Sequence, residues 1–122
     1  MSRDTMSLYE RLGRRDGIAR ITRTLIANHL ANPLVRTRFE NSDMARVEQH
    51  AVDFFCAGAG GPETYGGRDM LTTHRGMNIS AQEYMAAIDD ILVTLDRHRI
   101  DDQTRKDVLA IAYSLKGEIV HV

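Results

Sequence analysis

The sequence predicts an all-α fold, and three observations predict it. Apolar residues recur at i, i+3 and i+4 spacing, as on one face of a helix, in several segments. Serine or aspartate precedes most of these segments at the position that caps a helix. No alternating apolar and polar run is long enough for a strand. The 122 residues, of which 43% are hydrophobic, suit a single compact domain over residues 1–122.

Two helices are expected in the first quarter of the chain. Ser7 and Glu10 have the spacing of a capping box, and the short helix that they open should end at Gly13. Asp16 is expected to cap a second helix of about four turns, which stops at the Asn-Pro pair 32–33. The apolar positions of this second helix are Ile18, Ile21, Leu25 and Ile26.

A third helix and a long loop are expected in the middle of the chain. A short irregular link through residues 34–39 leads to Ser42 and Asp43, a second capping signal. The helix that follows carries an apolar stripe made of Met44, Val47, Ala51, Phe54 and Phe55. Residues 58–67, GAGGPETYGG, contain five glycines and a proline, which no helix tolerates across its interior, so they should form a loop.

Two further helices are expected before the C-terminus. Ser80 and Glu83 form a second capping box, and the pair Asp101 and Asp102 caps the last helix. The first of these two helices should turn Tyr84, Ile88, Ile91, Leu92 and Leu95 inward. The same spacing continues in the last helix through Val108, Ile111, Ala112, Leu115 and Ile119, nearly to the C-terminus.

Composition excludes several classes of partner. Lys and Arg number 16 against 17 Asp and Glu, so no basic excess would hold a nucleic acid. The N-terminal stretch MSRDTMSLYE carries charges where a signal peptide needs an apolar run, and no apolar run approaches the roughly 18 to 20 residues of a membrane span. We therefore expect a cytoplasmic, soluble monomer that binds neither membrane nor nucleic acid.

The single cysteine and the missing motifs narrow the chemistry. Cys56 cannot form an internal disulfide, and its apolar surroundings favour a small buried side chain. The sequence has no CxxCH motif for covalent haem attachment, no zinc-binding HExxH, and none of the glycine-rich motifs that bind phosphates.

The five histidines differ in their surroundings. His98 and His121 lie near helix ends among polar residues, which favours contact with solvent, and His29 suits a surface or half-buried position. His50 lies beside the apolar stripe of the third helix, and His74 follows the glycine-rich loop on a segment of about two helical turns. Each of the last two alone is typical of an ordinary boundary histidine. Together, on separate segments, they could face each other across a flat macrocycle and bind its iron.

Four stretches of the chain resemble the truncated haemoglobins of group I. They are SLYERLG, LANPLVRTRFENSDMARV, GGPETYGGRDM and the histidine four residues after Met70, and the likeness runs from Ser7 to the last helix. The resemblance implies a two-over-two α-helical sandwich that encloses haem, in which the helix before the haem-binding histidine is largely replaced by loop.

The resemblance also implies a site for b-type haem. His74 matches the proximal histidine that binds the iron, and Phe39 matches the phenylalanine that packs on the haem face. Arg68 matches a basic residue that can bind a haem propionate. Apolar contacts with haem are expected from Ile26, Val47, Ala51, Phe54, Phe55 and Met70.

The distal side departs from the family's commonest pattern of a tyrosine on the second helix and glutamine or leucine on the third. Ile26, Val47 and Ala51 stand there, and none donates a hydrogen bond to bound dioxygen, which disfavours tight dioxygen storage. His50 matches a histidine that binds iron as sixth ligand in cyanobacterial members. Those members also carry a histidine in the last helix that links covalently to haem, where this chain has Gly117. His121 lies one turn further, so a link through it stays open.

The resemblance implies that the chain binds dioxygen, nitric oxide or carbon monoxide, with two histidines on the iron at rest. An enzymatic alternative is nitric oxide dioxygenase or nitrite reductase activity with electrons from a separate reductase. A third alternative is a haem-free helical adaptor. A Soret band would exclude the adaptor, and turnover of nitric oxide with a reductase would distinguish the enzyme from a gas-binding protein.

Overall fold

The computed structural model describes residues 6–122, so residues 1–5 of the charged N-terminal stretch lie outside the described residues. Six α-helices and two short 3₁₀ helices follow one another: α1 Leu8–Arg11, α2 Arg14–Ala31, η2 Arg36–Phe39, α3 Met44–Gly58, α4 Met70–His74, α5 Ala81–Arg97, α6 Asp102–Ser114 and η3 Lys116–Glu118. No β-strand occurs in residues 6–122, where a single isolated bridge joins Ile79 and Val120. The all-α prediction is confirmed.

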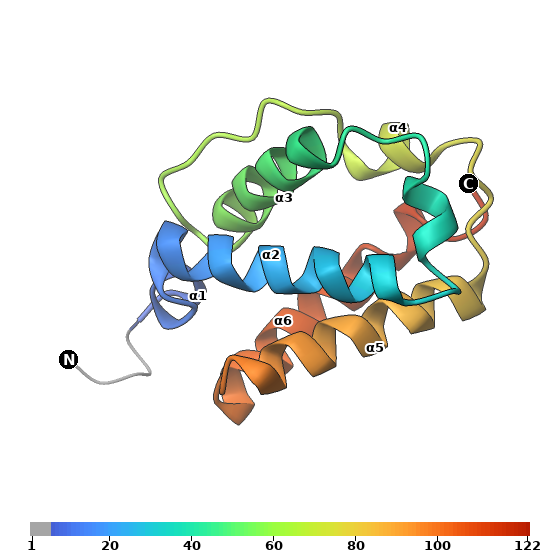
Figure 1. Ribbon diagram of the computed structural model, residues 1–122. Coiled ribbons are helices and arrows are strands. Elements are labelled where there is room, and N and C mark those ends of the chain that lie inside the picture. Colours follow the sequence, from blue (N-terminus) through green and yellow to red (C-terminus); the bar gives the residue numbers. More distant parts are fainter. Residues whose placement is uncertain (1–5) are drawn as a thin grey trace.

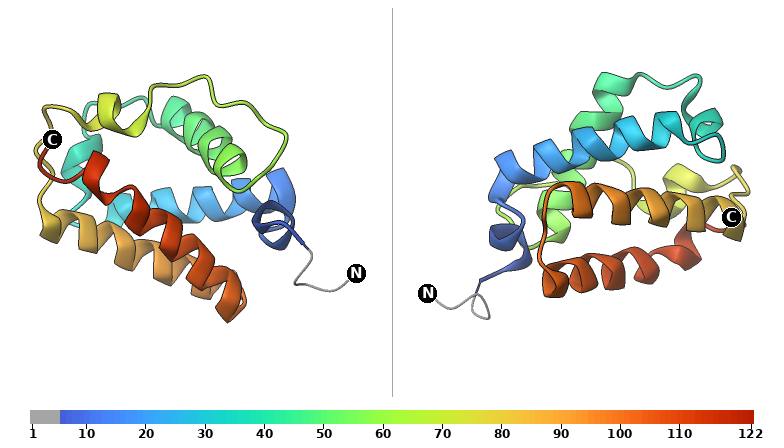
Figure 2. Two further views of the ribbon diagram at one scale, coloured as in Figure 1. Left: turned by 180° about the vertical axis from the view of Figure 1, so that it is seen from behind. Right: turned by 60° about the horizontal axis from the view of Figure 1, so that its bottom comes forward.

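The long helices form two antiparallel pairs. Figures 1 and 2 show α2 beside α3 and α5 beside α6, with α2 also packed along α5. This is the two-over-two arrangement that the resemblance to the group I truncated haemoglobins implies. None of the helices in the described part of the chain is both long and apolar enough to cross a membrane.

Four predicted caps are present. Ser7 with Glu10 and Ser80 with Glu83 form capping boxes at the starts of α1 and α5. The side chains of Asp43 and Asp101 accept the N3 backbone N–H at the starts of α3 and α6. These bonds satisfy amide groups that have no partner inside the helix, which explains why short polar residues mark the helix starts so well.

Three local predictions are wrong. Asp16 does not cap α2, because that helix begins earlier, at Arg14, after Gly13 turns the chain at φ 94°. Asp16 lies in the first turn, where its charge favours the positive end of the helix dipole. The expected irregular link contains the 3₁₀ helix η2, and α6 ends at Ser114 with a 3₁₀ turn after it rather than continuing to Ile119.

One hydrophobic cluster joins the first three helices. Ile18, Val52, Cys56 and Ala59 are buried together, and Leu8, Tyr9, Leu12 and Ala19 pack against them. The Cys56 side chain is 0% exposed, and burial raises the pKa of its thiol to about 11. The thiol therefore stays protonated and behaves as a small buried hydrophobic group, as predicted.

The loop between α3 and α4 depends on its glycines. Gly60 has φ 91°, a conformation that side chains disfavour. A Cβ at Gly67 would lie 2.4 Å from the hydroxyl oxygen of Tyr65, so only glycine leaves room for that ring. The loop covers residues 59–69, because Gly58, the first glycine of the glycine-rich stretch, still belongs to α3.

The C-terminal residues pair with the segment that follows α4. The Val122 carbonyl accepts the backbone N–H of Gly76 at 3.1 Å and of Asn78 at 3.2 Å. The backbone N–H of His121 donates to the Ile79 carbonyl at 2.9 Å. We call this pairing of residues 120–122 with residues 76–79 the C-terminal clasp. It ties the end of the sequence to the neighbourhood of His74 (Figure 1).

Candidate functional site

The site begins with His74, the last residue of α4. Its Nδ1 atom lies 2.7 Å from the Met70 carbonyl oxygen one turn earlier. A carbonyl oxygen accepts hydrogen bonds and never donates them, so Nδ1 carries the proton and donates it. In the neutral ring Nε2 then keeps its lone pair, which is the form of imidazole that binds a metal.

The short helix that carries His74 is stabilised at its start. Asp69 caps α4 through a bond from the Thr72 backbone N–H to its carboxylate at 2.7 Å. Hydrogen bonds from Thr72 hold the pKa of Asp69 below its usual value. The C-terminal clasp holds the residues after α4. A five-residue helix is not stable in isolation, so these contacts fix the direction of the His74 ring.

His50 lies on α3 and faces an aromatic ring of the α3–α4 loop. Its ring meets the Tyr65 ring edge to face, with centroids 6.4 Å apart and planes at 90°. Tyr65 also contacts Phe54 at 5.2 Å between centroids, and its hydroxyl donates to the Arg68 carbonyl at 2.5 Å. Sequence reasoning missed Tyr65, although it is the only aromatic residue in the glycine-rich loop.

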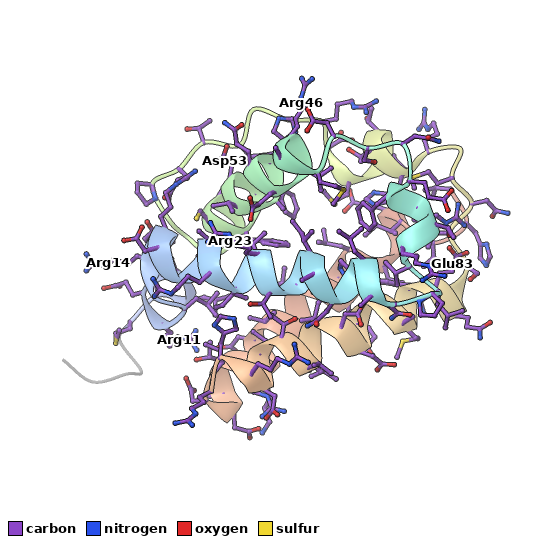
Figure 3. The ribbon with its side chains drawn as sticks, in the orientation of Figure 1. Arg11, Arg14, Arg23, Arg46, Asp53 and Glu83 are labelled. Carbon is purple, nitrogen blue, oxygen red and sulfur yellow. The ribbon has the colours of Figure 1, made fainter. Side chains whose placement is uncertain are left out.

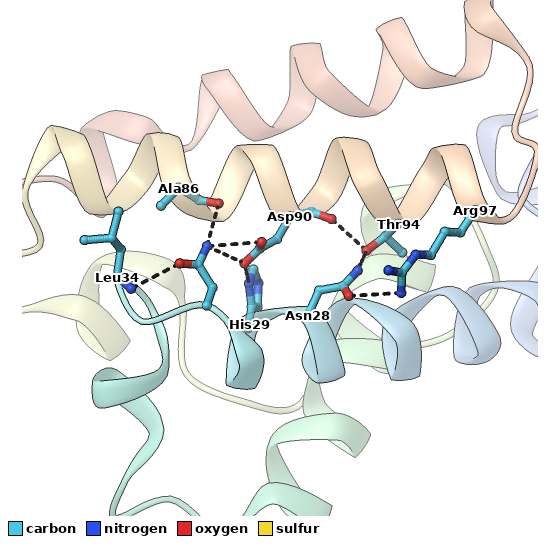
Figure 4. A network of polar contacts seen from close by, with 8 residues as sticks. Asn28, His29, Leu34, Ala86, Asp90, Thr94 and Arg97 are labelled. Atoms are coloured by element: carbon cyan, nitrogen blue, oxygen red, sulfur yellow. Dashed lines mark hydrogen bonds and ion pairs between the residues drawn. The ribbon is translucent and has the colours of Figure 1, made fainter.

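Phe39 lies at the end of η2 and stacks on His29. The two rings are 6.0 Å apart at 13° between planes. Behind Phe39, His29 Nδ1 lies 2.7 Å from Asp90 Oδ2, and the Asn32 amide donates to both Asp90 oxygens at 3.1 and 3.2 Å (Figure 4). Asp90 is only 9% exposed. Sequence reasoning left His29 as a surface or half-buried residue and did not find this polar network.

Arg38 links η2 to α5 and to the segment after His74. Its guanidinium donates to both carboxylate oxygens of Glu83, at 2.6 and 2.8 Å, and to the Met77 carbonyl at 2.8 Å. Figure 3 shows Glu83 close to η2. The hydrogen bond from Arg38 is the main reason that the pKa of Glu83 falls to about 2. Arg38 therefore holds η2, which ends at Phe39, through a bidentate ion pair with Glu83. It also holds the segment after His74 through its hydrogen bond to the Met77 carbonyl.

The remaining predicted site residues come from four elements. Figure 1 shows η2, α3 and α4 on the same side of α2. Protein atoms cover the predicted apolar residues only in part, and Arg68 is exposed. The partly covered side chains are those of Ile26, Phe39, Val47, Ala51, Phe54, Phe55 and Met70.

The potential metal-binding side chains suit a metal ion that a macrocycle already holds and that needs few ligands from the protein. No group of three or more His, Cys, Asp or Glu side chains in residues 6–122 could hold a metal ion alone. His74 instead offers one correctly protonated imidazole, on the helix that also carries the partly covered side chain of Met70. These residues fit a haem group, whose iron needs one imidazole and whose faces need apolar contacts.

The chain matches the bacterial-like globin family over residues 7–121. It belongs to that family. Among curated proteins it is 28% identical over 114 residues to the group 1 truncated hemoglobin of Tetrahymena pyriformis, covering 84% of this chain and 94% of that protein. It is 26% identical over 115 residues to the group 1 truncated hemoglobin GlbN of a Nostoc species, covering 94% and 98%. The group 1 assignment made from sequence is confirmed.

Solved globins confirm the fold. The Tetrahymena pyriformis truncated hemoglobin in its Fe(III) form superposes with a TM-score of 0.92 at 24% identity, covering 96% of this chain and all of that one. The 2/2 hemoglobin of Synechococcus, in the cyanomet state with covalently attached heme, gives 0.85 at 26% identity, covering 91% and 94%. As a truncated globin, the chain has haem iron as its cofactor and diatomic gases as its ligands.

Proposed function

We propose that this globin holds a b-type haem through His74 and binds diatomic gases on the opposite face. The observation that carries the proposal is the 2.7 Å hydrogen bond from His74 Nδ1 to the Met70 carbonyl. It fixes the tautomer and the ring orientation, and a hydrogen-bonded imidazole is a better electron donor to iron. When bound, the haem would supply a coordination site for the gas and a one-electron redox couple.

The remaining side chains hold the macrocycle and exclude water. Phe39 presents its ring to one face, braced from behind by His29. Phe54, Phe55 and Met70 would supply apolar contacts, and their partial exposure to solvent in this structure supports that role. Arg68 is exposed and has a guanidinium group available for a propionate.

We propose that the haem is not covalently attached. The Synechococcus globin carries a covalently attached heme. In this chain Gly117 stands where a linking histidine is expected, in the 3₁₀ turn η3. His121 is exposed, and its Nδ1 lies 3.0 Å from the Asn78 side-chain oxygen, within the C-terminal clasp. These contacts support a structural role for His121.

On the distal side we propose that His50 is the sixth ligand of the resting iron. The support is its place on α3 and the apolar nature of Ile26, Val47 and Ala51, which leave His50 as the polar group of the predicted distal set. Without a donor at those three positions, bound dioxygen gains little stabilisation. This favours redox turnover of nitric oxide or nitrite, with electrons from a separate reductase, over storage of dioxygen.

Replacement of His74 tests the proximal assignment. His74→Gly should lose most of its haem or regain a ligated spectrum when free imidazole is added, because imidazole can occupy the place of the lost side chain. The matched control is His98→Gly, since His98 bonds to Thr24 at the far end of α5 and should leave the Soret band unchanged. An unaltered spectrum and haem affinity in His74→Gly would show that another residue binds the iron.

A further inference from the structure

A basic hollow lies between α2 and the C-terminal end of α5. It is a shallow hollow of about 500 Å³ that is wide open to solvent. We call it the α2–α5 hollow, and its lining residues are Arg20, Arg23, Thr24, Ala27, Arg97 and His98. Figure 1 shows that this end of α5 is far from α4, which carries His74. The hollow is therefore separate from the haem site.

The arginines of the hollow carry positive charge that the protein does not neutralise. Arg20 and Arg97 are exposed, and neither pairs with a carboxylate in the part of the chain that the structure describes. Arg97 donates only to the amide oxygen of Asn28, at 3.4 Å. Arg23 uses its Nε to bind Glu48 at 3.1 Å, which leaves its two terminal nitrogens for another acceptor. The whole chain has a net charge of −1, so this concentration of cations is local.

The floor of the hollow is ordered by hydrogen bonds. The Thr24 hydroxyl donates its one hydrogen to the Arg20 carbonyl at 3.2 Å. The same oxygen lies 2.8 Å from His98 Nε2, so a hydrogen bond joins α2 to the end of α5 at this point. Ala27 is the only apolar side chain in the lining. The hollow thus offers the hydrogen-bond donors of its arginines, set among the carbon stems of the same side chains.

We propose that the α2–α5 hollow binds a small molecule that carries two or more linked phosphate groups. Guanidinium groups bind phosphate oxygens through two parallel N–H donors. Arg20 and Arg97 come from different helices and line the same hollow, which suits an anion with two charged groups. The proposal does not depend on any role of the haem iron.

Calorimetric titration of the haem-loaded protein with inorganic pyrophosphate tests the proposal. Saturable binding of one pyrophosphate per chain is expected, and it should weaken as salt is raised because the charges are exposed. Arg20→Gln and Arg97→Gln should each weaken binding by roughly tenfold, the effect of losing one charge-assisted hydrogen bond.

The matched control is Arg14→Gln. Arg14 lies on the same helix and is exposed, but it is at the start of α2 and outside the hollow (Figure 3). Its replacement should leave the affinity unchanged. Equal weakening in all three variants would mean attraction to general charge and would overturn the proposal, as would the absence of saturable binding.

Two further ligands define the chemical class. Adenosine diphosphate that binds more tightly than pyrophosphate supports a nucleotide as the ligand, and equal affinity supports the diphosphate group alone. Citrate carries comparable negative charge on carboxylates and should bind at least tenfold more weakly. Citrate binding as tight as pyrophosphate binding would overturn the assignment to phosphate chemistry.

Discussion

The His50 imidazole meets the edge of the Tyr65 ring at 6.4 Å between centroids, with the two planes perpendicular. Tyr65 is itself fixed by Phe54, by the Arg68 carbonyl and by the space that Gly67 leaves. His50 therefore has a fixed partner within the protein. If it also binds iron, the two arrangements compete, and their relative free energies set the fraction that is six-coordinate.

Removing the Tyr65 ring should favour the iron-bound arrangement. In Tyr65→Ala the His50 ring loses its aromatic contact, so the low-spin, six-coordinate fraction of the ligand-free ferrous protein should rise in its visible spectrum. An aromatic pair is worth about 0.5 to 1.5 kcal/mol, which corresponds to a change of roughly two- to tenfold in the ratio. Tyr65→Phe keeps the ring and serves as the control. An equal rise of the six-coordinate fraction in Tyr65→Ala and Tyr65→Phe would mean that the hydrogen bond from the Tyr65 hydroxyl to Arg68, and not the ring contact, controls that fraction.

Replacement of His50 should speed carbon monoxide binding. An internal ligand must dissociate before an external one binds, so the wild-type rate is limited by the competent fraction. His50→Ala should be five-coordinate or water-bound and should bind carbon monoxide faster in rapid-mixing experiments. High-spin ferrous spectra and equal single-phase rates in both proteins would remove His50 from the iron ligands.

Truncation of Phe39 should quicken haem loss. The ring stacks on His29 and is expected to cover one haem face, so Phe39→Ala loses aromatic contact on both sides and admits water. We expect the holoprotein to be destabilised by about 3 kcal/mol, the lower end of the range for a buried phenylalanine. Transfer of haem to an apo-acceptor protein measures the loss rate. Unchanged transfer would show that Phe39 does not contact haem.

Asp90 should be worth more to stability than its neighbour Asp89. Asp90→Ala leaves the buried donors of His29 and Asn32 without an acceptor, which should lower the free energy of unfolding by about 3 kcal/mol. Asp89 is exposed, so Asp89→Ala should change stability by less than about 0.5 kcal/mol. Urea unfolding of the two variants gives the comparison. Similar values would mean that the network around Asp90 contributes little.

The Arg38–Glu83 ion pair should make stability fall in acid. Because the hydrogen bond from Arg38 lowers the folded-state pKa of Glu83 from 4.5 to about 2, the pair stabilises the fold fully above pH 4.5. That contribution, roughly 2 to 3 kcal/mol, is lost as the pH falls towards 2. The difference in unfolding free energy between wild type and Glu83→Gln should therefore shrink over this interval. The exposed pair of Arg23 and Glu48 gives a control, since Glu48→Gln should have little effect at any pH.

The sequence predicted the start of a helix correctly where a capping residue and a partner close to it in sequence determine that start. Capping by Ser7, Asp43, Ser80 and Asp101 involves residues three positions apart, so short segments of sequence contain the whole signal. The prediction that Asp16 caps α2 was wrong because it rested on the same kind of local pattern. A cap and a first-turn acid look alike in sequence, and the turn at Gly13 determined where α2 begins.

The candidate site was predictable only as far as the family resemblance reached. His74, His50 and Phe39 were named from matching motifs, and the hydrogen bond of His74 to Met70 gives the proximal assignment a physical basis. The contact of His29 with Asp90 joins residues 61 positions apart, and nothing in a local pattern reports such a pair. Tyr65 was missed because its partner His50 lies on another element.

The C-terminal clasp has a consequence for the order in which the globin is made. Synthesis proceeds from the N-terminus, and α4 is too short to be stable before its partners exist. The residues that hold the segment after His74 are 120–122, which are synthesised after α5 and α6. A nascent chain that has already folded α2 and α3 therefore still lacks an ordered proximal histidine. Haem capture with native geometry must follow the synthesis of residues 120–122.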